Sequence, residues 1–159
     1  MNELSNKLSK YFNKYYKNFE KKYQDNSLNY LTEGRIDVVA KIIYCEFFLN
    51  ITPTSFNKMF YYLHLKKWNN AKARDSNKNN FSDFEKSFKE IILSIKKIGF
   101  DDQKSIIPVD ENNNIIDGSH RVAASIVLNK KITVAKFKVK SPKIDITSFA
   151  QRFNFMKNE

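Results

Sequence analysis

The spacing of apolar residues predicts helices over most of the first two thirds of the chain. Aromatic residues recur at intervals of four and predict a helix over residues 4–23. A second helix is predicted over residues 32–49, where apolar side chains fall on one face. A third helix begins at Pro53, since proline suits a first helical turn, and runs to about Lys67. We expect the apolar faces of these helices to form a core or an interface.

Turn and cap residues place the next boundaries. Residues 69–80 are polar and basic without periodicity, which predicts a long loop. A fourth helix is predicted from Ser82, because Ser82 and Glu85 have the spacing of a capping box. Gly99 ends this helix as a left-handed residue after its last turn.

Beyond Gly99 the apolar runs become short and alternate, as in strands. The predicted elements are strands over residues 105–109, 115–116 and 132–139, a helix over residues 121–128, and one or two helical turns from residue 145. The expected fold class is therefore α+β. Residues 1–80 form a helical N-terminal extension with a basic loop, and residues 81–159 form a compact α/β core.

The composition fits one globular domain. The chain has 159 residues, of which 42% are hydrophobic, so it can bury a substantial core. A single cysteine, Cys45, excludes an internal disulfide framework. One Cys and two His in these contexts do not make a Cys/His metal cluster. Cys45 lies in an apolar helical stretch, and we expect it to be a buried, small hydrophobic residue.

The charge and hydropathy of the chain limit its location and its partners. The N-terminus lacks a signal-peptide core, and the apolar stretch over residues 38–49 is interrupted by Lys41 and Glu46. We therefore expect a cytoplasmic protein without a membrane span. A net charge of +11 favours an anionic partner but does not choose among nucleic acid, nucleotide and membrane surface. The densest basic patch consists of Lys66, Lys67, Lys72, Arg74 and Lys78.

The segment over residues 115–131 is the most informative for function. A predicted strand ends at Ile116, Gly118 permits a sharp turn, and a helix follows at once. The first amides of such a helix point at the turn and attract anions. Ser119 and His120 add donors, and Arg121 can bind a phosphate through two parallel hydrogen bonds. These residues predict a phosphate site, although a simple helix cap at Ser119 and a pairing of Asp117 with Arg121 would give the same local pattern.

The stretch from Phe84 to about Phe137 resembles the ParB/sulfiredoxin superfamily. The resemblance rests on the helix end SIKKIGF, the segment IIPVDENNNIIDGSHRVAA and the strand ITVAKF. That family is known for a Gly-x-x-Arg turn that holds nucleotide phosphates. Sulfiredoxins carry a cysteine where this chain has Ser119, and ParB proteins continue into a DNA-binding domain for which this chain is too short. The Asp-Gly-x-His-Arg form looks most like the free-serine-kinase branch.

This resemblance implies a kinase or phosphotransferase that uses ATP, ADP or another nucleotide with Mg²⁺ to phosphorylate a small-molecule hydroxyl or amide. Gly118, Ser119, His120 and Arg121 would hold the phosphates, and Asp117 would hold Mg²⁺ or orient the acceptor. Kinases of this branch use a glutamate ahead of the helix, where this chain offers Asp75. Glu33 or Asp37 could serve instead.

Further candidates lie outside the turn. His64 follows apolar residues and is either a core residue or a phosphate contact and proton carrier. Lys72 and Arg74, with Lys67, could close over bound phosphates as a basic lid, or they belong to a solvated loop.

Two alternative functions stay open: a ParB-like nucleic-acid-binding module and a nucleotide-binding module without catalysis. The longer pattern, with GRIDVVAKIIYCEFF and YLHLKKWNN, resembles bacterial proteins associated with surface polysaccharide synthesis and suggests a sugar or amino-acid acceptor.

Overall fold

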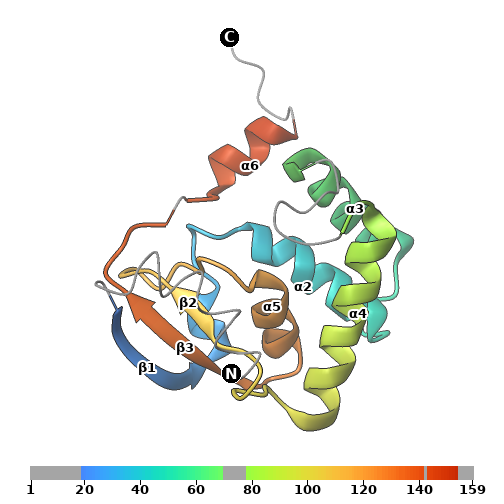
Figure 1. The fold of residues 1–159 in the computed structure, drawn as a ribbon. Coiled ribbons are helices and arrows are strands. Elements are labelled where there is room, and N and C mark those ends of the chain that lie inside the picture. The colour runs from blue at the N-terminus through green and yellow to red at the C-terminus, as the bar shows by residue number, and fades with distance from the viewer. Residues whose placement is uncertain (1–18, 70–77, 142, 154–159) are drawn as a thin grey trace.

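The computed structural model of this chain describes residues 19–69, 78–141 and 143–153. Those residues form an α+β fold with a small mixed sheet on one side and a group of helices on the other (Figure 1). The predicted α+β class is confirmed. Among the described residues, no helix is long and apolar enough to cross a membrane.

The sheet has three strands in the order β1-β3-β2. The central strand β3 (Lys131–Phe137) pairs antiparallel with β1 (Phe19–Asn26) and parallel with β2 (Ile107–Val109). The helix predicted over residues 4–23 is therefore wrong from Phe19 onward, and residues 1–18 lie outside the described part. A central strand forms hydrogen bonds with a neighbouring strand on each of its two edges, and β1 is the neighbour of β3 on one of them. This pairing outweighs the helical preference that the four-residue aromatic spacing indicates.

The helices are arranged around α5, which packs against both α2 and α4. Their bounds are η2 (Ser27–Tyr30, a 3-10 turn), α2 (Asp37–Phe48), α3 (Ser55–Asn69), α4 (Phe81–Ile98), α5 (Ser119–Val127) and α6 (Ile146–Arg152). All five predicted helical segments after residue 30 are present with shifted ends. The helix predicted from residue 32 begins at Asp37, and the helix predicted from residue 121 begins at Ser119.

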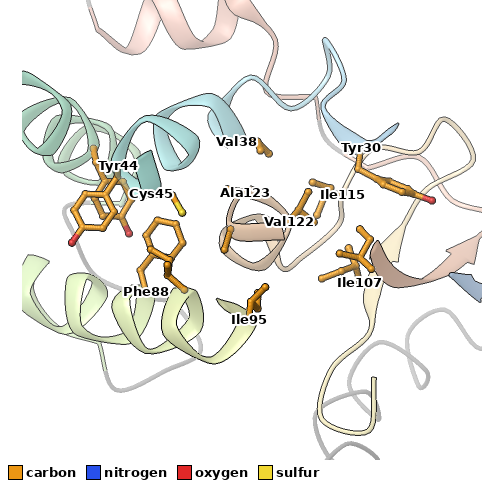
Figure 2. Packing of buried hydrophobic residues seen from close by; sticks show 14 of the residues in the cluster. Tyr30, Val38, Tyr44, Cys45, Phe88, Ile95, Ile107, Ile115, Val122 and Ala123 are labelled. Carbon is orange, nitrogen blue, oxygen red and sulfur yellow. The ribbon is translucent and has the colours of Figure 1, made fainter. Parts of the chain in front are cut away.

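The hydrophobic core lies between α5 and its neighbours (Figure 2). Val122 and Ala123 of α5 are fully buried, with Phe88 of α4 on one side and Val38 of α2 on the other. The small side chain of Ala123 lets the neighbouring helices approach closely. Burying a large apolar side chain contributes roughly 1.5–3 kcal/mol, so this layer is a main source of stability. The core draws on residues from both sides of residue 80 and has no break there.

The helix caps differ in part from the sequence prediction. Asn80, not Ser82, caps α4, because its side-chain oxygen accepts the amide of Asp83 at 3.1 Å. The predicted capping box of Ser82 and Glu85 is wrong, and Glu85 instead accepts a hydrogen bond from the Tyr44 hydroxyl at 2.9 Å. The terminating role of Gly99 is confirmed by its positive φ of 78°.

A tight hairpin joins β2 to the segment that leads into α5. The Asp110 carboxylate accepts hydrogen bonds from the amides of Asn112 and Asn114 and from Ser141. Ile115 then forms a single antiparallel bridge with Val109, so the strand predicted at residues 115–116 is reduced to one bridge. The hairpin fixes where the chain turns toward α5. The prediction for Cys45 is confirmed, since it is fully buried in α2.

Candidate functional site

The turn before α5 has a geometry that only glycine fits. Gly118 is buried and adopts φ +90°, in the left-handed region. A Cβ atom at this position would lie 2.7 Å from Cδ1 of Ile107 and 2.8 Å from Nη2 of Arg121. The guanidinium of Arg121 therefore lies folded back against the Gly118 backbone, at the start of its own helix.

The first amides of α5 are available at this turn. The amides of Arg121 and Val122 both donate to the Gly118 carbonyl, at 2.9 and 3.1 Å. Within the part of the chain that the structure describes, the amides of Ser119 and His120 have no hydrogen-bond acceptor. A helix start with open amides and an adjacent guanidinium is a favourable place for an anion.

Lys78 adds a second cation to the same corner. Burial lowers the pKa of Lys78, the Asp117 carboxylate opposes that shift, and the Arg121 guanidinium adds to it. Both side chains are thus within electrostatic range of the Lys78 ammonium, which lies 5.3 Å from the Phe84 ring centroid. Lys78 belongs to the basic patch predicted from the sequence, and in the structure it lies within electrostatic range of Asp117 and Arg121. Asp117 is exposed and Arg121 half-buried there.

His120 points away from the turn, into the protein. Its Nε2 shares a hydrogen bond of 2.8 Å with the Tyr61 hydroxyl, and its ring packs edge-on against Phe88 with centroids 4.7 Å apart. Burial lowers the pKa of His120 well below its usual range, and the nearby positive charge of Lys41 lowers it further. The ring is therefore neutral and links the turn to α3 and α4.

A buried polar cluster, defined as Arg35, Asp37, Lys41 and His64, lies near enough to His120 to act on its pKa. These four side chains belong to residues that are 7%, 4%, 3% and 2% exposed. Arg35 binds both carboxylate oxygens of Asp37, at 2.7 and 3.0 Å. Lys41 Nζ donates to Asp37 Oδ2 at 2.8 Å and lies 3.3 Å from His64 Nε2. One carboxylate thus holds two buried cations.

The electrostatics of the buried polar cluster follow from this pairing. Burial alone would raise the pKa of Asp37, but the charges of Lys41 and Arg35 outweigh burial and hold it well below its usual range. Burial lowers the pKa of His64 to about 3, and Lys41 contributes to the shift. Among the described residues, His64 Nδ1 is buried and has no hydrogen-bond partner. His64 is therefore a neutral side chain at neutral pH.

Charged groups at the turn and in the buried polar cluster both shift the pKa of His120. After burial, the groups that act on the pKa of His120 include Lys41, Lys78 and Asp37, which come from both places. The structure thus brings Asp117, Gly118, Ser119 and Arg121 together at the turn, and His120 lies within electrostatic range of the cluster that contains His64.

Several other candidates do not join this group. Glu33 is exposed, and Asp37 is already held by Arg35 and Lys41. Lys72, Arg74 and Asp75 lie outside the described residues.

Sequence reasoning missed Arg35, Lys41 and Lys78 as members of a polar site. One signal was available for Lys41, because it interrupts an otherwise apolar helical stretch. A lysine in such a stretch must find a carboxylate within the protein, and Asp37, four residues earlier, is within reach on the same helix. The approach of Lys78 to Asp117 depends on tertiary structure and has no comparable local signal.

The described residues contain no group of three or more His, Cys, Asp or Glu side chains placed to hold a metal ion. Comparisons of the chain with protein-family models, with curated proteins and with solved structures find no match.

Proposed function

We propose that this protein binds the phosphates of a nucleotide at the Gly118 turn and transfers a phosphoryl group to a small molecule. The observation that carries the proposal is the crowded, left-handed Gly118, which holds the Arg121 guanidinium at a helix start where two amides have no acceptor among the described residues. Lys78 contributes a further positive charge at the same corner. Phosphoryl transfer depends chiefly on positioning and on charge neutralisation of this kind.

Magnitudes support a nucleotide of moderate affinity. A hydrogen bond to a charged group contributes about 1.5–3 kcal/mol. A helix N-terminus contributes roughly 0.3–1 kcal/mol. Together these approach the ~4 kcal/mol that a millimolar dissociation constant requires. Tighter binding would need contacts to the base or ribose as well.

The proposed family is the ParB/sulfiredoxin superfamily, in its free-serine-kinase-like branch. Support comes from the Gly-x-x-Arg turn between an extended segment and α5, within an α+β fold with a small mixed sheet. The acceptor would be a hydroxyl or amide of an amino acid or sugar, and the donor ATP or ADP. The proposal places the protein in the cytoplasm, where such nucleotides are abundant.

A magnesium ion fits the chemistry of this corner. Mg²⁺ is commonly held by one or two carboxylates together with substrate phosphates and water. Asp117 is an exposed carboxylate directly before Gly118, so it is the group that would hold a nucleotide-bound Mg²⁺. The metal would neutralise phosphate charge during transfer.

Nucleotide binding without transfer is the second candidate. Specific observations favour it, because Asp37, His64 and His120 are not placed to act as a general base. Asp37 is held between Arg35 and Lys41, while His64 is buried, His120 is half-buried, and both are neutral. A general base must reach the acceptor hydroxyl.

Calorimetric titration of ATP, ADP, CTP and GTP with Mg²⁺ tests the binding step. Arg121→Ala should raise the dissociation constant of the best nucleotide about 10- to 100-fold, as loss of a charge-assisted bond implies. Lys97→Ala, an exposed change near the end of α4, is the matched control and should leave affinity unchanged. Wild-type protein that binds none of the four nucleotides would refute the proposal.

Phosphorus NMR with a panel of amino acids and sugars separates the two candidate functions. Loss of the donor phosphoryl signal together with a new phosphoester or phosphoramidate signal supports transfer. Tight nucleotide binding without any such product across the panel supports the non-catalytic candidate. Arg121→Ala should abolish transfer in the first case.

A further inference from the structure

An apolar groove lies on α2, α3 and α4, on elements that do not form the Gly118 turn. Its volume is about 450 Å³. The lining residues are Phe47 of α2, Ser55, Lys58, Met59 and Tyr62 of α3, and Phe81 of α4. The α3 residues follow a spacing of three and four, so they share one face of that helix. The groove is therefore a continuous strip along α3 between two neighbouring helices.

The floor of the groove leaves apolar surface in contact with water. Met59 is 50% exposed and Tyr62 is 36% exposed, and Phe56 beside them on α3 is 57% exposed. Single exposed apolar residues are ordinary, but adjacent ones that line a groove are typical of an interaction site. The exposure of Met59 and Tyr62 also argues against a small-molecule pocket, because such ligands are mostly enclosed.

The rim of the groove is basic. Lys58 and Lys89 both bind Glu85, at 3.0 and 3.3 Å, and their side chains are 47% and 40% exposed. The Glu85 side chain is only 14% exposed and also accepts the Tyr44 hydroxyl, so its charge is largely covered. Lys66 lies 5.9 Å from the Tyr62 ring centroid. Lys58, which lines the groove, thus shares one largely covered carboxylate with Lys89, and Lys66 lies near Tyr62 of the apolar floor.

We propose that this groove binds an acidic amphipathic helix of a partner protein. A helix of that kind places apolar residues at positions i, i+3 or i+4, and i+7 into a groove, and its acidic flanks would face the three lysines. A second copy of this chain fits poorly, because a net charge of +11 on each copy opposes the contact. A nucleic acid would meet the lysines but leave the apolar floor uncovered.

Selection from a phage-displayed library of helical peptides tests the proposal directly. Wild-type protein is the target, and Met59→Glu protein removes clones that bind elsewhere. We expect the enriched peptides to combine the apolar spacing with an excess of Asp and Glu. Enrichment of basic or neutral peptides, or no enrichment beyond that on the Met59→Glu protein, would overturn it.

Fluorescence anisotropy with the most enriched peptide then locates the site. Met59→Glu and Lys58→Glu should each weaken binding at least about tenfold, because one disrupts the floor and both repel acidic flanks. Leu93→Glu is the matched control, since Leu93 is an exposed apolar residue of α4, 54% exposed, that does not line the groove. Equal loss in all three variants would contradict the assignment.

Light scattering of the free protein tests whether a second copy of this chain occupies the groove in place of a partner protein. A monomer whose mass is unchanged by Met59→Glu supports a foreign partner. A dimer that Met59→Glu dissociates would show that a second copy occupies the groove and would overturn the proposal. Nucleotide titration of the Met59→Glu protein should match wild type, so this result is independent of the proposed function.

Discussion

The Gly118 turn and the buried polar cluster both carry charges that act on the pKa of His120, and they use those charges differently. In the cluster, Asp37 binds Arg35 and Lys41 inside the protein, and all three residues are nearly inaccessible to water. At the turn, Asp117 is exposed, Arg121 is half-buried, and two helix amides have no acceptor among the described residues.

Because of this difference, we expect the cluster to affect the stability of the fold and the turn to affect ligand binding. Charges whose partners are built into the fold determine whether the fold is stable, because removing one partner leaves another charge buried. Groups that face solvent at a helix start can bind an external anion without reorganisation of the core. We therefore expect changes in the cluster to affect unfolding and changes at the turn to affect nucleotide binding.

The largest effect is expected from Asp37→Ala. This change leaves Arg35 and Lys41 buried without their carboxylate, and breaking such a pair typically costs about 3–5 kcal/mol. Urea unfolding followed by circular dichroism measures the loss. Asp101→Ala is the control, because Asp101 pairs with the exposed Lys104 and its loss should cost less than ~1 kcal/mol. Similar losses in both variants would show that the cluster contributes no more than a surface pair.

A smaller but more local effect is expected from Gly118→Ala. The left-handed backbone costs about 1–2 kcal/mol for a residue with a Cβ. That Cβ would also displace Ile107 or Arg121. Nucleotide affinity should fall together with stability, as calorimetry and urea unfolding can measure. Gly99→Ala is the matched control, because Gly99 also has a positive φ but its Cβ would meet no atom within 4 Å. It should lower stability and leave nucleotide affinity unchanged.

An effect that grows gradually as the pH falls is expected from acidification. The pKa of His64 is lowered to about 3 in the folded protein, and the pKa of His120 is also lowered, so the unfolded chain takes up these protons first. The stabilisation is complete above the unfolded pKa near 6.5 and is lost as pH falls toward the folded value. Below about pH 6, each histidine should lower the unfolding free energy by up to about 1.4 kcal/mol for every unit by which the pH falls.

The variant His64→Phe measures how much of this pH dependence of the unfolding free energy comes from His64. The substitution keeps an aromatic ring against Phe149, whose centroid lies 5.7 Å from that of His64. Between about pH 5 and pH 6, where most carboxylates remain ionised, the slope of the unfolding free energy should fall to roughly half the wild-type value. An unchanged slope would mean that His64 takes up its proton at a similar pH in the folded and unfolded chain.

Local sequence signals predicted much of the secondary structure. Apolar periodicity identified α2, α3 and α4, and the positive φ expected at Gly99 is present. The same signal failed at Phe19–Tyr23, where pairing with β3, more than a hundred residues away in the sequence, determines the conformation. The cap of α4 also moved from Ser82 to Asn80, because both residue types can cap and local sequence does not choose between them.

The candidate site was predictable where its residues are adjacent in the chain. Gly118 and Arg121 are three residues apart, so one turn of backbone brings the guanidinium to the glycine. His120 was expected to face a phosphate together with Arg121. Its side chain is instead hydrogen-bonded to Tyr61, because the position one residue before Arg121 on α5 faces α3 and α4.

By itself, the sequence determined the α+β composition, the glycine turn before α5 and the burial of Cys45, since each follows from residue types within a few positions of one another. Only the tertiary structure decided that β1 pairs with β3, that Arg35 and Lys41 share Asp37 with His64 beside them, and that Lys78 lies within electrostatic range of Asp117 and Arg121. These contacts join segments of the chain whose approach depends on packing of the whole core. No periodicity within one segment encodes them.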